Sequence, residues 1–249
     1  MERRKLLVST GALAIGGVAG CLDGDDQPDE SGETTASGSD EQPVVNGEAY
    51  PTMNYDDVDV PLAPLEDVYE WYDSDAVSVV DTRSEHQYEV SHIAGAALSP
   101  APTGPDSDDP VEAWDEDGLI VTYCVCPHAM AVQRAAALIQ DGYENVYALD
   151  EGFNAWIEAG YPLEGDDVDE ELPAFDVQGR TDPAYEGEFV WIRDPVTGQR
   201  EPGQIDADGR YEMTLYFTDV DDDTVLEVDG PEYTHELTLA EITSDVITA

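Results

Sequence analysis

Positive charge is scarce in this sequence. The 249-residue chain has 9 lysine and arginine residues against 58 aspartate and glutamate residues, a formal net charge of −49, and Lys5 is its only lysine. This composition argues against binding of nucleic acid or of an anionic membrane through a basic patch. It also makes the folded chain repel itself, and molar salt, with a Debye length of about 3 Å, screens most of that repulsion. We therefore expect adaptation to molar salt, as in a halophilic archaeon.

The apolar run at the N-terminus is short. It covers residues 6–19, follows Arg3 and Arg4, and ends at a Val-Ala-Gly-Cys sequence whose cysteine is Cys21. Such a run is too short to span a bilayer comfortably. The segment 1–21 resembles a twin-arginine export signal with a lipoprotein cleavage box, which would leave a lipidated Cys21 as the mature N-terminus. An uncleaved membrane anchor is the alternative. Both predict an extracytoplasmic protein tethered to the membrane.

Cysteine is also scarce, with 3 residues in the chain, and two of them, Cys124 and Cys126, lie in one short segment. The segment opens with an apolar run at 119–121, typical of a buried central strand, and enters an Ala-rich helix predicted over 129–141. Open α/β sheets place their ligands where such a strand ends. Backbone N–H groups and the positive end of the helix dipole favour a thiolate there. The segment therefore predicts a site for sulfur chemistry.

The pattern of elements predicts an α/β unit over residues 56–165. Before it, residues 22–55 are rich in Asp, Glu, Ser, Gly and Thr, which predicts a disordered acidic linker. Strands alternate with short helices in the unit itself, which indicates a parallel sheet flanked by helices on both faces. Besides the cysteine segment, the expected elements are helices at 62–73, 86–90 and 151–159, strands at 77–80 and 146–149, and a turn into a strand at 92–98. Residues 100–117 indicate a polar surface excursion.

Five segments of this unit together resemble the ordered motifs of a rhodanese-like domain. They are residues 80–83 (VDTR), 92–96 (HIAGA), 120–124 (IVTYC), 142–147 (GYENVY) and 151–156 (EGFNAW). In that family a loop cysteine takes a sulfane sulfur from a donor, carries it as a persulfide and passes it to a nucleophilic acceptor. The resemblance thus implies a sulfurtransferase with a small sulfur donor, a thiol acceptor and no cofactor.

The cysteine loop departs from the family pattern. Family members commonly have an arginine in the loop that helps to hold an anionic donor, whereas residues 125–131 contain neither Arg nor Lys and Arg134 comes a helical turn later. This departure puts thiosulfate in doubt as the donor and excludes the phosphatase relatives of the fold, which need a bidentate arginine. The strand-end position favours Cys124 as the nucleophile over Cys126. Counted back from Gly142, the loop is slightly long for Cys124 and slightly short for Cys126.

The resemblance and the loop position imply roles for particular residues. Cys124 is expected to accept the sulfur, Cys126 to resolve the persulfide or form a disulfide, and His128 to orient the loop or the thiolate. We expect Asp81 and Arg83 to form a scaffold ion pair, and His92 to hydrogen-bond backbone in its turn. The residues expected to contact the substrate are Val125, Pro127, Ala129, Met130 and Arg134.

Two other interpretations of the cysteine loop stay open. Cys124, Cys126 and His128 carry ligand types that suit zinc or copper, although the fourth ligand is not visible in the sequence. Alternatively, the two cysteines form an exported dithiol or disulfide on a catalytically inactive domain that serves in binding or redox sensing.

Residues 172–249 predict a small antiparallel β-sandwich domain. β-rich runs at 188–193, 211–218, 224–229 and 233–239 are separated by turn signals at 195–198 and 206–209. From Tyr211 to Thr218 apolar and polar residues largely alternate, as in a half-buried strand. The pattern resembles transthyretin-like or immunoglobulin-like modules. The domain has no cysteine, and we expect it to serve as a spacer, a partner surface or a cover for the first unit.

Overall fold

The computed structural model describes residues 49–125, 128–169 and 172–249. The predicted export signal, Cys21, most of the predicted linker, Cys126 and Pro127 lie outside the described residues. Within the described ranges, no helix combines the length and the apolar character that a membrane crossing requires.

A six-stranded sheet forms the centre of the first part. Its strands lie in the order β1-β2-β7-β6-β3-β5, and all neighbours are parallel except the antiparallel hairpin of β1 and β2. The strands are β1 Thr52–Tyr55, β2 Val58–Ala63, β3 Ser78–Asp81, β5 Ala97–Leu98, β6 Leu119–Tyr123 and β7 Asn145–Leu149. The strand that carries the cysteine segment, β6, is therefore interior, with β7 and β3 as its neighbours.

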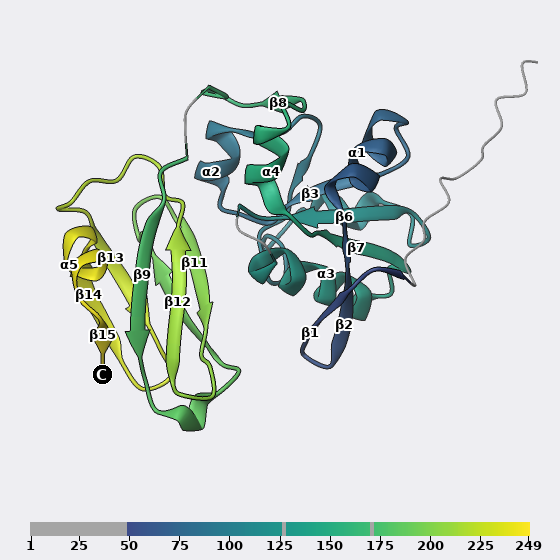
Figure 1. Cartoon of the computed structure of the whole chain (residues 1–249). Helices are drawn as coiled ribbons and strands as arrows, with labels where there is room; N and C mark the ends of the chain where they lie inside the picture. Colours follow the sequence, from purple (N-terminus) through teal and green to yellow (C-terminus); the bar gives the residue numbers. More distant parts are fainter. Residues whose placement is uncertain (1–48, 126–127, 170–171) are drawn as a thin grey trace, which may run out of the picture. The chain divides into compact units, whose positions relative to one another are not determined.

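Helices cover both faces of this sheet, as the sequence predicts (Figure 1). Helix α3 (Ala129–Asp141) packs over one face, and α1 (Leu65–Asp73) and α4 (Gly152–Glu158) over the other. Side chains of β6 alternate between the two hydrophobic clusters, with Ile120 toward α3 and Val121 toward α1 and α4. The smaller elements are α2 (Glu85–Val90), β4 (His92–Ile93), η2 (Pro110–Ala113) and β8 (Leu163–Glu164).

Local sequence explains where two of these helices begin or end. Ser84 starts α2 with a capping box, in which its hydroxyl accepts from the Gln87 N–H and the Gln87 side chain accepts from the Ser84 N–H. Helix α3 ends at Gly142, which has a φ of 108° and donates its N–H to the Ile139 carbonyl 3.1 Å away. A residue with a Cβ is strained at that backbone angle, so glycine fits the position.

Two predicted boundaries are wrong. The linker predicted to run through residue 55 ends earlier, because Thr52–Tyr55 forms β1 and pairs with β2. The helix predicted from residue 62 begins at Leu65, because Leu62 and Ala63 pair with β7 as the end of β2. The excursion at 100–117 is also more ordered than expected, since it contains η2 and buries Ala101 and Val111.

The remaining described residues form mainly antiparallel β-sheets, in agreement with the predicted strand pattern. A four-stranded sheet has the order β11-β10-β13-β14, and a three-stranded sheet has the order β12-β9-β15. The strands are β9 Phe175–Arg180, β10 Phe189–Arg193, β11 Arg200–Gln204, β12 Arg210–Leu215, β13 Val225–Asp229, β14 Thr234–Thr238 and β15 Ile247–Thr248. Both sheets contribute to one buried cluster, which includes Tyr211, Met213 and Leu215, as the predicted alternation requires.

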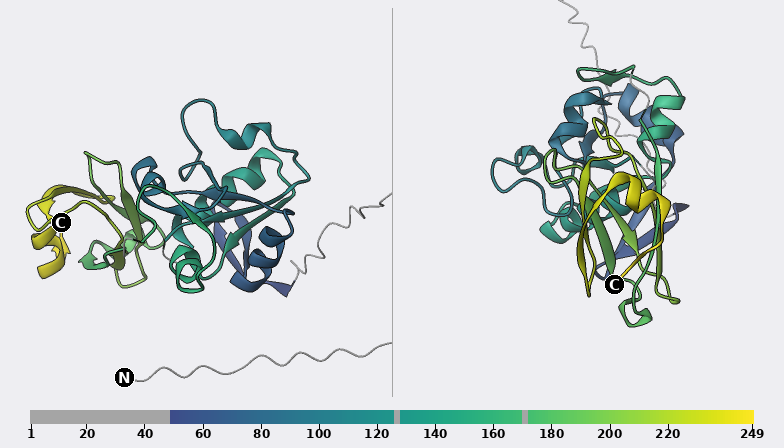
Figure 2. Two further views of the ribbon diagram at one scale, coloured as in Figure 1. Left: turned by 90° about the horizontal axis from the view of Figure 1, so that it is seen from above. Right: turned by 90° about the vertical axis from the view of Figure 1, so that its left-hand side faces the viewer.

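The sequence did not indicate β9, β11 or the C-terminal elements of this part. Helix α5 (Leu239–Ser244) begins at the last residue of the strand predicted at 233–239, and it packs beside β9 and β14. Figure 2 shows this helix in yellow near the C-terminus. The strand β15 that follows is parallel to β9, an exception in the otherwise antiparallel pairing. The described residues between 49 and 249 all belong to one compact unit.

Candidate functional site

Cys124 is the first residue after β6, at the C-terminal edge of the parallel strands. Its carbonyl accepts the N–H of Phe153, the second residue of α4, at 2.9 Å, which ties the strand end to the start of that helix. The residue is 1% exposed and belongs to the hydrophobic cluster under α3, together with Ile120 and Met130. Burial of this kind disfavours a thiolate unless dipoles or charges compensate for lost hydration.

Two of the residues expected to contact the substrate have buried side chains. Val125 and Met130 are both 0% exposed, so neither residue is open to a ligand in the described structure. Ala129, the first residue of α3, is half-buried. Pro127, like Cys126, lies outside the described residues.

His128 makes a contact with a carboxylate that the sequence analysis did not anticipate. Its Nε2 lies 2.6 Å from Oδ1 of Asp150, and the two side chains are 20% and 34% exposed. An Nε2–H that donates to a carboxylate leaves Nδ1 of a neutral imidazole as a proton acceptor. Asp150 follows β7, the neighbour of β6, and the carboxyl ends of adjacent parallel strands meet at one edge. The position of Asp150 directly after the strand β7 is therefore the sequence signal that could have placed this residue near the cysteine loop.

The backbone at His128 is also unusual, since its φ is 89°. Positive φ values are uncommon for residues other than glycine, and backbone strain of this kind concentrates at functional sites. His128, the residue before the first turn of α3, therefore holds its imidazole beside Asp150 while its own backbone has an uncommon conformation.

The predicted ion pair between Asp81 and Arg83 is present and buried. Nη2 of Arg83 lies 2.6 Å from Oδ2 of Asp81 and also donates to the Ser91 carbonyl at 2.6 Å. The hydroxyl of Tyr123 donates to the same carboxylate at 2.7 Å, and the guanidinium lies 4.3 Å from the centre of the Phe153 ring. Burial lowers the pKa of Arg83, but the charge and hydrogen bonds of Asp81 outweigh it and place that pKa above its ordinary value. This network joins the ends of β3 and β6 next to Cys124.

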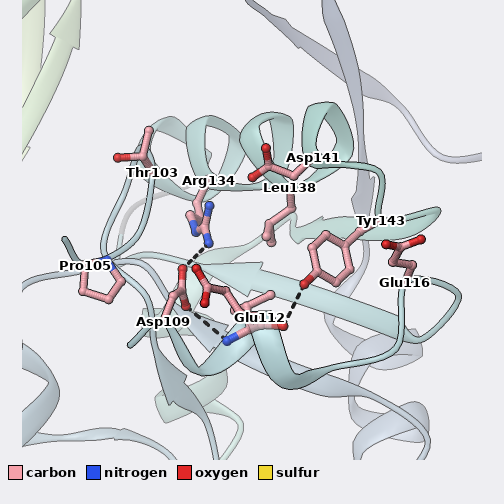
Figure 3. A pocket seen from close by; sticks show the side chains of 10 residues that line it. Thr103, Pro105, Asp109, Glu112, Glu116, Arg134, Leu138, Asp141 and Tyr143 are labelled. Carbon is pink, nitrogen blue, oxygen red and sulfur yellow. Dashed lines mark hydrogen bonds and ion pairs between the residues drawn. The ribbon is translucent and has the colours of Figure 1, made fainter. Parts of the chain in front are cut away.

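The side chain of Arg134 is bound by Asp109 and Ser99, which lie outside the cysteine loop. Its Nη2 lies 2.6 Å from Oδ2 of Asp109, and its Nε donates to Oγ of Ser99 at 2.9 Å. Burial lowers the pKa of Arg134 more than the Asp109 carboxylate raises it. Figure 3 shows Arg134 joined to Asp109 in the lining of a cavity, which Glu112, Asp141 and Tyr143 also line. The volume of this cavity is about 400 Å³. Arg134 thus supports the excursion at 100–117, and nothing in these contacts connects it to a bound donor.

The remaining predicted residues occupy ordinary structural positions. Nδ1 of His92 lies 2.7 Å from the carbonyl oxygen of Tyr88, the backbone bond expected in this turn. Phe153 and Trp156, which belong to the motif at 151–156, are fully buried in the cluster between the sheet and helices α1 and α4. Among the residues that the structure describes, no group of three or more His, Cys, Asp or Glu side chains is arranged to hold a metal ion.

Comparison with known proteins identifies the first part of the chain. A family model described as "Rhodanese-like domain" matches residues 64–159. Over 94 residues the chain is 37% identical to a "Thiosulfate sulfurtransferase GlpE" of Pseudoalteromonas translucida, and the match covers 37% of this chain and 83% of that protein. The chain belongs to the rhodanese-like family.

Two further rhodanese-related proteins are similar over the same part. A "Thiosulfate sulfurtransferase GlpE" of Pseudomonas fluorescens is 38% identical over 87 residues, with 34% of this chain and 74% of that protein covered. The solution structure of a rhodanese-like domain from Anabaena sp. aligns with a TM-score of 0.39 at 23% identity, over 45% of this chain and 85% of that domain. The rhodanese-like match lies within the predicted α/β unit.

Proposed function

We propose that this chain is a sulfurtransferase that carries sulfane sulfur as a persulfide on Cys124. The observation that carries the proposal is the place of Cys124, directly after the interior strand β6 and shortly before α3, in a domain of the rhodanese-like family. The similar proteins are named thiosulfate sulfurtransferases. Main-chain N–H groups of the loop and the N-terminus of α3 are the dipoles that would favour a thiolate and an anionic persulfide there.

The proposed transfer has two steps. The Cys124 thiolate attacks the outer sulfur of a thiosulfate or polysulfide donor, a new S–S bond forms, and the donor's own S–S bond breaks with its electron pair on the leaving group. With mercaptopyruvate the bond that breaks is the C–S bond, and pyruvate leaves as its enolate. An acceptor thiolate then attacks the outer sulfur of the persulfide, and Cys124 leaves as a thiolate again. A neutral His128, with Nε2–H directed to Asp150, would accept the proton of the incoming thiol at Nδ1.

The burial of Cys124 favours a second candidate function. A thiol that is 1% exposed, in a loop without Arg or Lys, suits a rhodanese-like module that binds a partner or senses redox state without turnover. A metal site that uses Cys124, Cys126 and His128 is the third possibility, and elemental analysis of protein purified without chelator tests it. One metal ion per chain, lost in Cys126→Ser, would support that site.

The experiment that separates these functions measures cyanide-labile sulfur. Full-length protein in molar salt is incubated with thiosulfate, mercaptopyruvate or polysulfide, and the labile sulfur is quantified. The sulfurtransferase proposal expects labile sulfur in the wild type and in Cys126→Ser and none in Cys124→Ser. Labile sulfur that persists in Cys124→Ser and disappears in Cys126→Ser would move the nucleophile to Cys126. A wild type that gains no labile sulfur from any donor would favour the non-enzymatic module.

The location and the second part of the chain belong to the same proposal. We propose that the lipidated Cys21 tethers the protein outside the cytoplasm, in molar salt, and that residues 172–249 form a β-sandwich domain beside the rhodanese-like domain. The short N-terminal apolar run after Arg3 and Arg4 supports the tether, and the shared cluster of the two β-sheets supports the sandwich. Metabolic labelling with a radioactive lipid precursor, with Cys21→Ala as the control, tests the tether.

A further inference from the structure

The few positive charges of this chain are distributed unevenly. Two of the arginines in the described part, Arg83 and Arg134, are buried in ion pairs of the rhodanese-like domain. The other four described arginines lie in the β-sheets and form two pairs that face each other across neighbouring strands. The pairs are Arg193 with Arg200 on β10 and β11, and Arg180 with Arg210 on β9 and β12. Like charges directly opposite on a sheet are destabilising.

Neither of these arginine pairs forms an ion pair with any described aspartate or glutamate, in a chain with 58 acidic residues. The pair of Arg193 and Arg200 differs from the other because Arg200 is half-buried, whereas Arg180 and Arg210 are both exposed. Glu227 on β13 is in register with Arg193, on the side away from Arg200, and it too forms no ion pair with Arg193. The two positive charges are thus adjacent and uncompensated within the described residues.

Arg200 is held in place by neutral groups. Its guanidinium donates a hydrogen bond to the carbonyl of Ala101 and lies 5.5 Å from the centre of the Trp191 ring. Burial lowers the pKa of Arg200, and the charge of Arg193 lowers it further. The fold therefore retains a partly desolvated, positioned cation next to a second cation, an arrangement that an anion would stabilise.

We propose that Arg193 and Arg200 form a binding site for a small divalent oxyanion of the sulfate and thiosulfate type on the β10–β11 hairpin. Two guanidinium groups match such an anion in charge, and their planar N–H forks match the spacing of its oxygens. Molar salt suppresses the long-range repulsion between the anion and the acidic chain, while the short contacts to the two guanidinium groups persist.

Backbone contacts connect the Ala101 carbonyl to the strand end that carries Cys124. The N–H of Ala101 donates to the Thr82 carbonyl at 2.9 Å, and the N–H of Thr82 donates to the Tyr123 carbonyl at 3.0 Å. Arg200 therefore reaches the C-terminal edge of the parallel sheet, where residues 125–131 contain neither Arg nor Lys. The role of this site in catalysis rests on the proposed sulfur transfer: the site would concentrate an anionic donor at this edge of the sheet. Binding of the anion itself does not depend on the chemistry of Cys124.

Titration calorimetry of the full chain with sodium thiosulfate and with sodium sulfate tests this site at a fixed molar concentration of sodium chloride. We expect one saturable site per chain in the wild type and in Cys124→Ser. Arg200→Gln and Arg193→Gln should each weaken binding about tenfold or more, the loss expected for a charged hydrogen-bonding partner. Because the Cys124→Ser chain is included, failure of sulfur transfer and failure of anion binding are distinguishable.

Thermal unfolding gives a second readout in case Arg200→Gln folds poorly. Arg193 is exposed, and its replacement by glutamine removes a like-charge contact, so Arg193→Gln should raise Tm without sulfate and lose most of the sulfate-dependent rise. Arg210→Gln is the matched control: it disrupts the other arginine pair and reports the general stabilisation by sulfate. A full wild-type response in Arg193→Gln, or an equal loss in Arg210→Gln, would overturn the proposal, as would no saturable binding.

Discussion

The two buried arginines of the rhodanese-like domain should differ sharply in their contribution to stability. Arg83 makes hydrogen bonds to both carboxylate oxygens of Asp81 and to the Ser91 carbonyl, and its pKa is raised because these contacts outweigh burial. The pKa of Arg134 is lowered, because burial outweighs its contact with Asp109. The ionised form is therefore favoured by folding at Arg83 and disfavoured by folding at Arg134.

The expected cost of Arg83→Met is about 3–5 kcal/mol, the usual range when one partner of a buried pair is removed and the other stays charged. Asp81 would keep only the N–H of residue 83 and the Tyr123 hydroxyl as donors. Arg134→Met should cost about 1–3 kcal/mol, because Ser99 still donates to Asp109 and the burial penalty of the guanidinium is relieved.

Urea unfolding in molar salt measures this difference, with the free energy of unfolding taken from the midpoint at an unchanged m-value. In a chain of this size, 3–5 kcal/mol corresponds to a fall in Tm of roughly 6–20 °C. Neither arginine changes its charge between pH 5 and 9, so the gap between the two variants should be independent of pH in that range. Equal costs for the two variants, or a larger cost for Arg134→Met, would refute the reasoning from their contacts.

Three further outcomes are expected. Gly179→Ala should lower the free energy of unfolding by about 1–3 kcal/mol or more, because the added Cβ would lie 2.0 Å from the buried Tyr211 ring. Urea denaturation measures this loss, and an unchanged free energy of unfolding would contradict the close packing of Tyr211 on Gly179. Hydrogen bonds from Thr238 lower the pKa of Glu241, so its contribution to stability is present above the unfolded-state pKa and is lost as the pH falls through the folded-state value. Glu241→Gln should therefore be less stable than wild type at pH 7 and approach it in acid, and a gap that widens in acid would be inconsistent with this cap. His128→Gln should slow persulfide transfer to a thiol acceptor, because it removes the proposed proton acceptor at Nδ1. His86→Gln should leave the transfer rate unchanged, because the His86 ring lies 3.2 Å from Asp219 without hydrogen-bond geometry.

The sequence predicted the elements around the cysteine well, because several independent signals agree there. A β-branched run marks β6, Ala-rich helical spacing marks α3, and Gly142 marks its end, so the bounds predicted for α3 are those observed. The sheet edge that carries Cys124, and the ion pair of Asp81 and Arg83, follow from the motif order and the strand ends.

Features that depend on contacts between distant segments were not predictable in the same way. The β1–β2 hairpin has polar, exposed residues in β1, so its local pattern does not differ from that of a linker. The partner of Arg134 is Asp109, one of many acidic residues in the 100–117 excursion, and no local signal distinguishes it. Asp150 was missed for another reason: its place after β7 predicts proximity to the cysteine loop, but only the structure shows that the His128 ring turns toward it.

The central claim, that Cys124 carries sulfane sulfur, is tested most directly by mass spectrometry of the intact protein after incubation with polysulfide in molar salt. The account predicts one added sulfur atom per chain, mapped by peptide analysis to Cys124, removed by a thiol acceptor and absent in Cys124→Ser. An unmodified chain after incubation, or a sulfur that maps to Cys126 and persists in Cys124→Ser, would contradict it.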